Sequence, residues 1–122
     1  MMESIAEGFD LMAQSEFNPN LKDVVRIYQQ QSVITSRLIE WLGEGFEIYG
    51  TNLEGVSGSV GALGEGQWTV DAAHRDGMRL PAIEESLTTR FVSQGKPSYR
   101  GKILQTMRNM FGGHSGVTKI ES

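Results

Sequence analysis

Arg90 is the residue of this sequence whose setting most directly suggests anion binding. It lies three residues after Leu87 and directly before Phe91, at the edge of a predicted apolar stripe. Its stem could be buried there while its guanidinium binds a carboxylate or a phosphate through two parallel hydrogen bonds. A structural ion pair with Glu84 or Glu85 explains the same position equally well. The sequence therefore leaves both interpretations open.

Arg108 and His114 form a second pair of cationic residues, six positions apart on either side of a Met-Phe-Gly-Gly segment. Two glycines after a helix end place the imidazole on a sharply turned segment, so both side chains could converge on one anion. The pattern by itself favours a simpler interpretation. In that interpretation Arg108 complements the dipole at a helix C-terminus, and His114 is exposed in the tail.

Residues 64–69, Gly-Glu-Gly-Gln-Trp-Thr, could bind a phosphate because glycines let backbone N–H groups approach an anion. They are not a nucleotide P-loop, since Gly-Lys-Ser/Thr is missing and no strand is predicted before them. The spacing favours a flexible surface loop over a ligand loop. His74 follows among Asp71, Arg75 and Asp76, where we expect a solvated side chain.

The sequence contains no complete catalytic set. The carboxylate pairs Glu84/Glu85 and Asp10/Glu16 have no spacing that would bring two acids to one reaction centre, and no Ser-His-Asp arrangement is visible. There is no cysteine, and the two histidines stand forty residues apart. We therefore expect neither thiolate chemistry nor a metal site.

Composition narrows the class of protein. The 122 residues suffice for one domain, which we expect to span residues 1–122. Fifteen acidic against eleven basic residues give a net charge of -4, which disfavours nucleic acid as a partner. No apolar run is long enough for a membrane span, and no signal peptide is visible. A cytoplasmic domain is the expectation.

The elements that must position these residues are all predicted to be helices. Met2, Ile5, Phe9 and Met12 share one helical face, with Ala6 and Ala13 on the same side. The helices are expected over residues 1–15, 21–31 after an Asn20 cap, 33–49 after a Ser32 cap, 69–76 after a Thr69 cap, 82–93 after Pro81, and 99–112 after a Ser98 cap. Gly77 is expected to stop the fourth of them.

The first helix starts without a capping residue, so we expect it to continue upstream, with a frayed native N-terminus as the alternative. A glycine-rich loop should join the third and fourth helices over residues 50–66. No segment alternates with period two, so the fold class is all-α, with about six helices.

Three segments together resemble a known family. They are Gly-Glu-Gly-Gln-Trp-Thr-Val at 64–70, the stretch from Leu-Pro-Ala-Ile to Leu-Thr-Thr-Arg-Phe at 80–91, and the stretch from Lys-Ile-Leu to Arg-Asn-Met-Phe-Gly-Gly-His at 102–114. In this order they resemble the C-terminal helical domain of decarboxylating 6-phosphogluconate dehydrogenase, most of all its shorter bacterial form. The first residues resemble the long helix that follows this family's catalytic segment.

The resemblance implies roles for four residues. Arg90 matches the arginine that binds the substrate phosphate, and Arg108 and His114 match an arginine and a histidine that reach into the partner subunit's site. Gln67 stands where longer forms of the family carry a phosphate-binding lysine, which leaves substrate preference open. The implied assembly is a homodimer or a higher oligomer that oxidises and decarboxylates 6-phosphogluconate in the pentose phosphate pathway.

The resemblance also implies what this chain lacks. The Rossmann domain that binds NAD or NADP, and the catalytic lysine, asparagine and glutamate, lie upstream of the matching segment. This chain alone should therefore be inactive. Two alternatives stay open, namely a standalone helical module that dimerises or binds an anion, and a domain of another β-hydroxyacid dehydrogenase. Uncovered apolar side chains also favour dimerisation, namely Trp41, Phe46, Met107, Met110 and Phe111.

Overall fold

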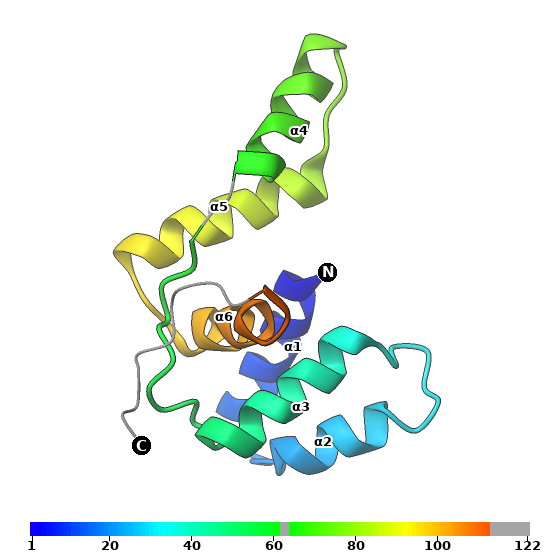
Figure 1. Cartoon of the computed structure of the whole chain (residues 1–122), viewed down its shortest axis with the longest axis vertical. Helices are drawn as coiled ribbons and strands as arrows, with labels where there is room; N and C mark the ends of the chain where they lie inside the picture. Colours follow the sequence, from blue (N-terminus) through cyan, green and yellow to red (C-terminus); the bar gives the residue numbers. More distant parts are fainter. Residues whose placement is uncertain (62–63, 113–122) are drawn as a thin grey trace.

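The computed structural model describes residues 1–61 and 64–112, and these residues form six α-helices and no β-strand. The helices are α1 (Met2–Gln14), α2 (Leu21–Tyr28), α3 (Arg37–Tyr49), α4 (Gly64–Arg75), α5 (Pro81–Gly95) and α6 (Tyr99–Gly112). This confirms the all-α prediction. Helices α1, α2, α3 and α6 pack together as a body, and α4 and α5 form a hairpin that extends away from it (Figure 1).

The core lies between the helices of the body. Ala6 and Phe9 of α1 are buried, and the Phe9 ring lies 6.0 Å from that of Phe46, between ring centroids. The predicted apolar face of α1 is thereby confirmed. Phe46 and Met107 are fully buried within their own chain, so the expectation that these two side chains need a partner chain was wrong.

Two glycines explain how closely α3 packs on its neighbours. A Cβ at Gly45 would lie 2.1 Å from the Thr106 methyl group of α6, and one at Gly43 would lie 2.7 Å from a Val25 methyl group of α2. Each glycine weakens the helix by about 1 kcal/mol relative to alanine. Because these two residues have no side chain, α3 can pack closely against both α2 and α6.

Several predicted helix ends are confirmed. The Asn20 side chain accepts hydrogen bonds from the backbone of Lys22 and Asp23, Pro81 stands in the first turn of α5, and the Ser98 hydroxyl accepts from the backbone of Gly101. Each of these signals is local in sequence, which is why they could be identified without the fold.

The predicted start of α3 was wrong. The Ser32 hydroxyl donates to the Tyr28 carbonyl at 2.6 Å and so closes the end of α2, while Ser36 caps α3. The intervening turn leaves Val33 and Ile34 exposed, although both were expected to continue the apolar stripe of α3. The Ser32 hydroxyl could either cap the start of the next helix or bond to the end of α2, and sequence alone does not rank these two options.

The glycine-rich segment is packed, in its described part 50–61, rather than loose at the surface. Leu53, Val56 and Val60 are buried, and Val60 is tied to α5 by a 2.9 Å hydrogen bond from its backbone N–H to the Ser93 hydroxyl. Gly58 and Gly101 approach so closely that a Cβ on Gly101 would lie 1.9 Å from the Gly58 carbonyl oxygen. This segment is therefore part of the core.

Helix α4 begins at Gly64, five residues before the predicted Thr69 cap, so the expectation of a loop over 64–69 was also wrong. Packing accounts for two of its glycines, because a Cβ on Gly64 would lie 2.9 Å from the Trp68 ring and one on Gly66 would lie 3.0 Å from a Leu87 methyl group. Gly77, with a φ of 75°, follows the helix as expected.

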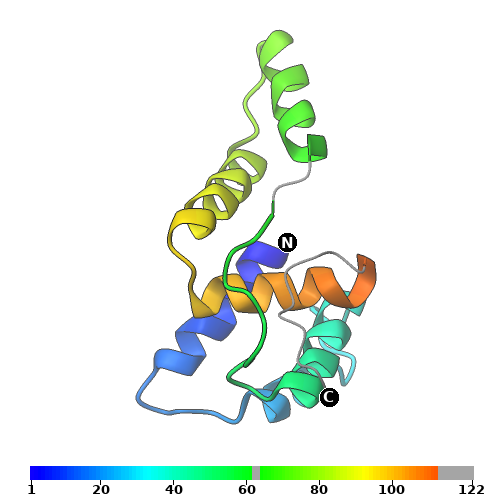
Figure 2. The same ribbon diagram turned by 60° about the vertical axis from the view of Figure 1, so that its left-hand side comes forward.

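The hairpin of α4 and α5 exposes much of its apolar surface, and the turned view in Figure 2 shows α4 far from the body while the C-terminal end of α5 lies next to it. Of the predicted α5 stripe only Leu87 is buried, whereas Ile83 and Phe91 are 41% and 52% exposed. Trp68 of α4 is 68% exposed. Within the described part of the chain, no helix combines the length and apolar character needed to cross a bilayer.

Candidate anion site

Arg90 of α5 forms an ion pair with Glu3 in the first turn of α1. Its Nε and Nη2 both lie 3.1 Å from Glu3 Oε1. The two side chains are 19% and 10% exposed. Arg90 is thus paired to a carboxylate as one interpretation expected, but to neither Glu84 nor Glu85. The partner is 87 residues away in sequence, and only the packing of α5 near α1 brings it there.

Arg108 of α6 lies close to this pair. It is buried, and its Nη1 donates a hydrogen bond to the Gly61 carbonyl. Burial lowers the pKa of Arg108, the positive charge of Arg90 lowers it further, and the negative charge of Glu3 opposes both. The interpretation in which Arg108 complements a helix C-terminus does not fit, because no basic residue stands in the last turn of α6.

Glu3, Arg90 and Arg108, which we name the Arg90 cluster, bring two guanidinium groups near one carboxylate. Arg90 pairs with Glu3 directly, and the charges of both influence Arg108. Two positive charges and one negative charge leave the cluster with a formal net charge of +1. A shallow pocket of about 380 Å³ opens beside it. The lining includes Glu3, Ser86 and Arg90 together with the apolar side chains of Leu38, Trp41 and Ile83. A solute can therefore reach the guanidinium of Arg90, and the excess positive charge favours an anion.

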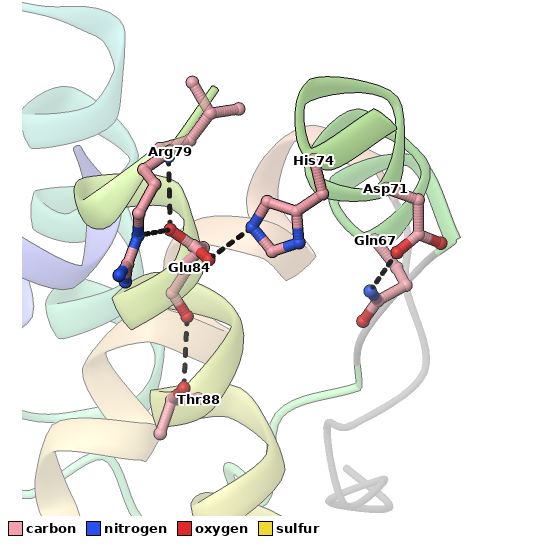
Figure 3. Close-up of polar contacts among 7 residues, drawn as sticks. Gln67, Asp71, His74, Arg79, Glu84 and Thr88 are labelled. Carbon is pink, nitrogen blue, oxygen red and sulfur yellow. Dashed lines mark hydrogen bonds and ion pairs between the residues drawn. The ribbon is translucent and has the colours of Figure 1, made fainter. Parts of the chain in front are cut away.

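Gln67, the third predicted contact residue, is engaged elsewhere. It is exposed on α4 and donates a 2.9 Å hydrogen bond to Asp71 one turn further along the same helix, as Figure 3 shows. Its amide is therefore held along α4 rather than by the Arg90 cluster. His114 lies outside the described residues.

His74 is half-exposed, but it is not merely solvated as expected. Its Nε2 lies 2.8 Å from Glu84 Oε1, which joins α4 to α5 (Figure 3). This hydrogen bond lowers the pKa of Glu84, burial opposes the shift, and the Leu80 backbone N–H and the Arg79 charge support it. Glu84 is thereby committed to the hairpin, which explains why it is not the partner of Arg90.

Glu3 is the residue of this site that sequence reasoning missed. A signal for it was present, because Glu3 and Asp10 lie on the same side of α1 as Ala6 and Ala13, two turns apart. Acidic residues on a buried helical face need partners. Asp10 finds one in Arg100, at 3.1 Å between Oδ2 and Nε.

The described residues include no group of three or more carboxylates and histidines arranged to hold a metal ion.

Comparison with known proteins relates this chain to one group of enzymes. No family model matches the chain. The chain is nevertheless related, over nearly all of its length, to a part of proteins named as 6-phosphogluconate dehydrogenases, which confirms the resemblance found in the sequence.

Two such relatives are informative. The Bacillus subtilis protein YqeC, whose name assigns that activity provisionally, is 34% identical over 119 residues, or 98% of this chain. The NAD(+)-dependent, decarboxylating 6-phosphogluconate dehydrogenase of Haloferax volcanii is 30% identical over the same length. In both cases this chain spans only 40% of the relative.

Proposed function

We propose that this chain is the substrate-binding and dimerisation part of a cytoplasmic 6-phosphogluconate dehydrogenase, whose reacting groups lie outside it. The whole enzyme would oxidise and decarboxylate 6-phosphogluconate to ribulose 5-phosphate. The observation that carries the proposal is the Arg90 cluster, because Arg90 pairs with Glu3 beside an open pocket and lies close to the buried charge of Arg108. The relationship to dehydrogenases of this name supplies the identity of the anion.

The residues of this chain would bind the phosphate group and orient the substrate. Arg90 has one edge of its guanidinium on Glu3 and retains N–H groups for a ligand. Arg108 adds a second positive charge nearby. A charged hydrogen bond of this kind contributes about 1.5–3 kcal/mol to binding. With Gln67 in place of a lysine, binding of the substrate phosphate would depend chiefly on the two arginines, with His114 as a further contact.

The nicotinamide cofactor, NAD or NADP, is assigned to the part of the enzyme outside this chain. The Haloferax relative is named as NAD(+)-dependent. A dinucleotide fold needs a strand followed by a glycine-rich turn and a helix, and the described residues contain no strand. These residues therefore do not fit the cofactor, and no step of the reaction is assigned to them.

Conservative variants of two arginines test the phosphate grip. Arg90→Lys keeps the charge beside Glu3 but loses the guanidinium fork, so 6-phosphogluconate should bind about 10- to 150-fold more weakly by calorimetry. Arg100→Lys is the matched control, since Arg100 also pairs with α1, through Asp10. It should bind normally. Unchanged affinity in Arg90→Lys would remove Arg90 from the site.

Dimerisation is supported by the exposed apolar side chains of the hairpin, namely Trp68, Ile83, Phe91 and Val92. Because Phe91 is half-exposed, Phe91→Glu should leave the fold intact and shift the chain toward monomer in light scattering. Val33→Glu, at a fully exposed position between α2 and α3, is the control and should not. A wild-type chain that is monomeric at high concentration would favour the standalone anion-binding module.

A further inference from the structure

We propose that Glu3 is the built-in counter-ion of the Arg90 cluster and sets its affinity for anions. It would hold Arg90 in place and cancel one of the two positive charges, so that an anion binds reversibly. This inference rests on the proposed function only for the identity of the phosphate ester. The charge balance itself concerns any anion that reaches the cluster.

The first support is the way Arg90 is held. Both Nε and Nη2 point to the same oxygen of Glu3, so one edge of the guanidinium is occupied and Nη1 is left at the other end. Guanidinium has five N–H donors, and the two contacts to Glu3 leave three. The paired edge fixes the direction in which the remaining donors face.

The second support is the burial of both partners and of Arg108. The Glu3 and Arg90 side chains are 10% and 19% exposed, and Arg108 is 4% exposed. Burial is the largest cause of the lowered pKa of Arg108, and repulsion by the charge of Arg90 lowers it further. The Glu3 carboxylate, which pairs with Arg90 and raises the pKa of Arg108, makes the arrangement tolerable without a ligand. The same carboxylate must repel an incoming phosphate.

The third support is a comparison within α1. Asp10 pairs with Arg100 at the same 3.1 Å, but Arg100 is 45% exposed, and Asp10 also accepts a hydrogen bond from Gln14. Among the described residues, no second arginine forms an ion pair with Asp10. Asp10 is therefore an ordinary structural ion pair, and it serves as the internal reference for Glu3.

The experiment compares Glu3→Gln with Asp10→Asn in the 122-residue chain. Glutamine still accepts a hydrogen bond from Arg90 and removes only the charge. Calorimetry at low ionic strength would measure sodium sulfate as a dianion and sodium nitrate as a monoanion. We expect Glu3→Gln to bind sulfate about five- to tenfold more tightly, and nitrate about two- to threefold, because the effect scales with ligand charge. Asp10→Asn should match the wild type.

A purely structural Glu3 gives the opposite result. Folded Glu3→Gln that binds sulfate no better than wild type, or with no preference for the dianion, overturns the proposal. If Glu3→Gln fails to fold in dilute buffer, sulfate should restore its circular dichroism, because the anion replaces the missing charge. Failure of sulfate to do so also overturns it.

6-Phosphogluconate separates this inference from the proposed function. A wild-type chain that ignores 6-phosphogluconate, while Glu3→Gln gains sulfate affinity, contradicts the proposed function and supports the role of Glu3. Conversely, wild-type binding of 6-phosphogluconate with no gain for either anion in Glu3→Gln supports the function and overturns the role of Glu3.

Discussion

The four-helix body and the α4–α5 hairpin are held together by different interactions. In the body, thirteen of the described apolar residues form one buried cluster, and none of these thirteen lies in α4 or α5. In the hairpin, Val70 and Leu87 are the buried apolar side chains, and a polar contact between His74 and Glu84 joins the two helices. Packing should therefore govern the stability of the body, and charge should govern the geometry of the hairpin.

The largest expected effect is the loss of stability when a core side chain of the four-helix body is removed. Phe46 is fully buried against Phe9, so Phe46→Ala should lower the free energy of unfolding by about 3–5 kcal/mol, measured by urea denaturation. Leu87→Ala in the hairpin should act locally, raising amide hydrogen exchange in α4 and α5 and leaving α1, α3 and α6 protected. Equal loss of protection in both regions would mean that they unfold as one unit.

A smaller effect tests the packing of the segment 50–61 on the body. Gly101→Ala would place a Cβ 1.9 Å from the Gly58 carbonyl oxygen, a backbone atom that has little freedom to move. Destabilisation by about 1–3 kcal/mol is expected. Gly8→Ala is the matched control, since nothing lies within 4 Å of its Cβ position on α1. That variant should be stabilised by about 0.5–1 kcal/mol. Equal responses would contradict the close contact.

The smallest expected effect is a change in the geometry of the α4–α5 hairpin at acidic pH. The hydrogen bond from His74 holds the pKa of Glu84 below its ordinary value of 4.5. A lowered pKa in the folded state means that the stabilising contribution is present above this ordinary value and is lost as the pH falls through the lowered one. In a Trp41→Phe background, the fluorescence of Trp68 on α4 should therefore change between about pH 5 and pH 3.

Glu84→Gln provides the control for this acid transition. It removes the titrating group while leaving Trp68 in place, so the fluorescence change should vanish. A transition of equal size in Glu84→Gln would assign the fluorescence change to another carboxylate. It would also mean that the His74–Glu84 hydrogen bond does not control the geometry of the hairpin.

Local signals predicted most of the helices and few of the contacts between them. The caps at Asn20 and Ser98 and the apolar face of α1 were predictable because each depends on residues within a few positions. The starts of α3 and α4 were not, since Ser32 and Ser36 compete for one boundary and glycines such as those at 64 and 66 are typical of loops.

The arrangement of the candidate anion site was predictable in part. Arg90 was a candidate from its place at the edge of an apolar stripe and Arg108 from the family resemblance, and the structure brings both close to Glu3. Gln67 was predicted beside them, yet its side chain is bonded to Asp71 on α4. The residues of the cluster come from three helices, and no periodicity in one segment specifies which charge from another will face it.

The sequence by itself determined that this protein is helical, where most of its helices lie, and which family it resembles, because helix periodicity and family motifs are written in neighbouring residues. Only the tertiary structure decided that Glu3 faces Arg90, that Arg108 is buried next to them, and that residues 50–61 belong to the core. Those outcomes depend on how whole helices pack, and a buried charge takes its partner from whichever surface packing places beside it.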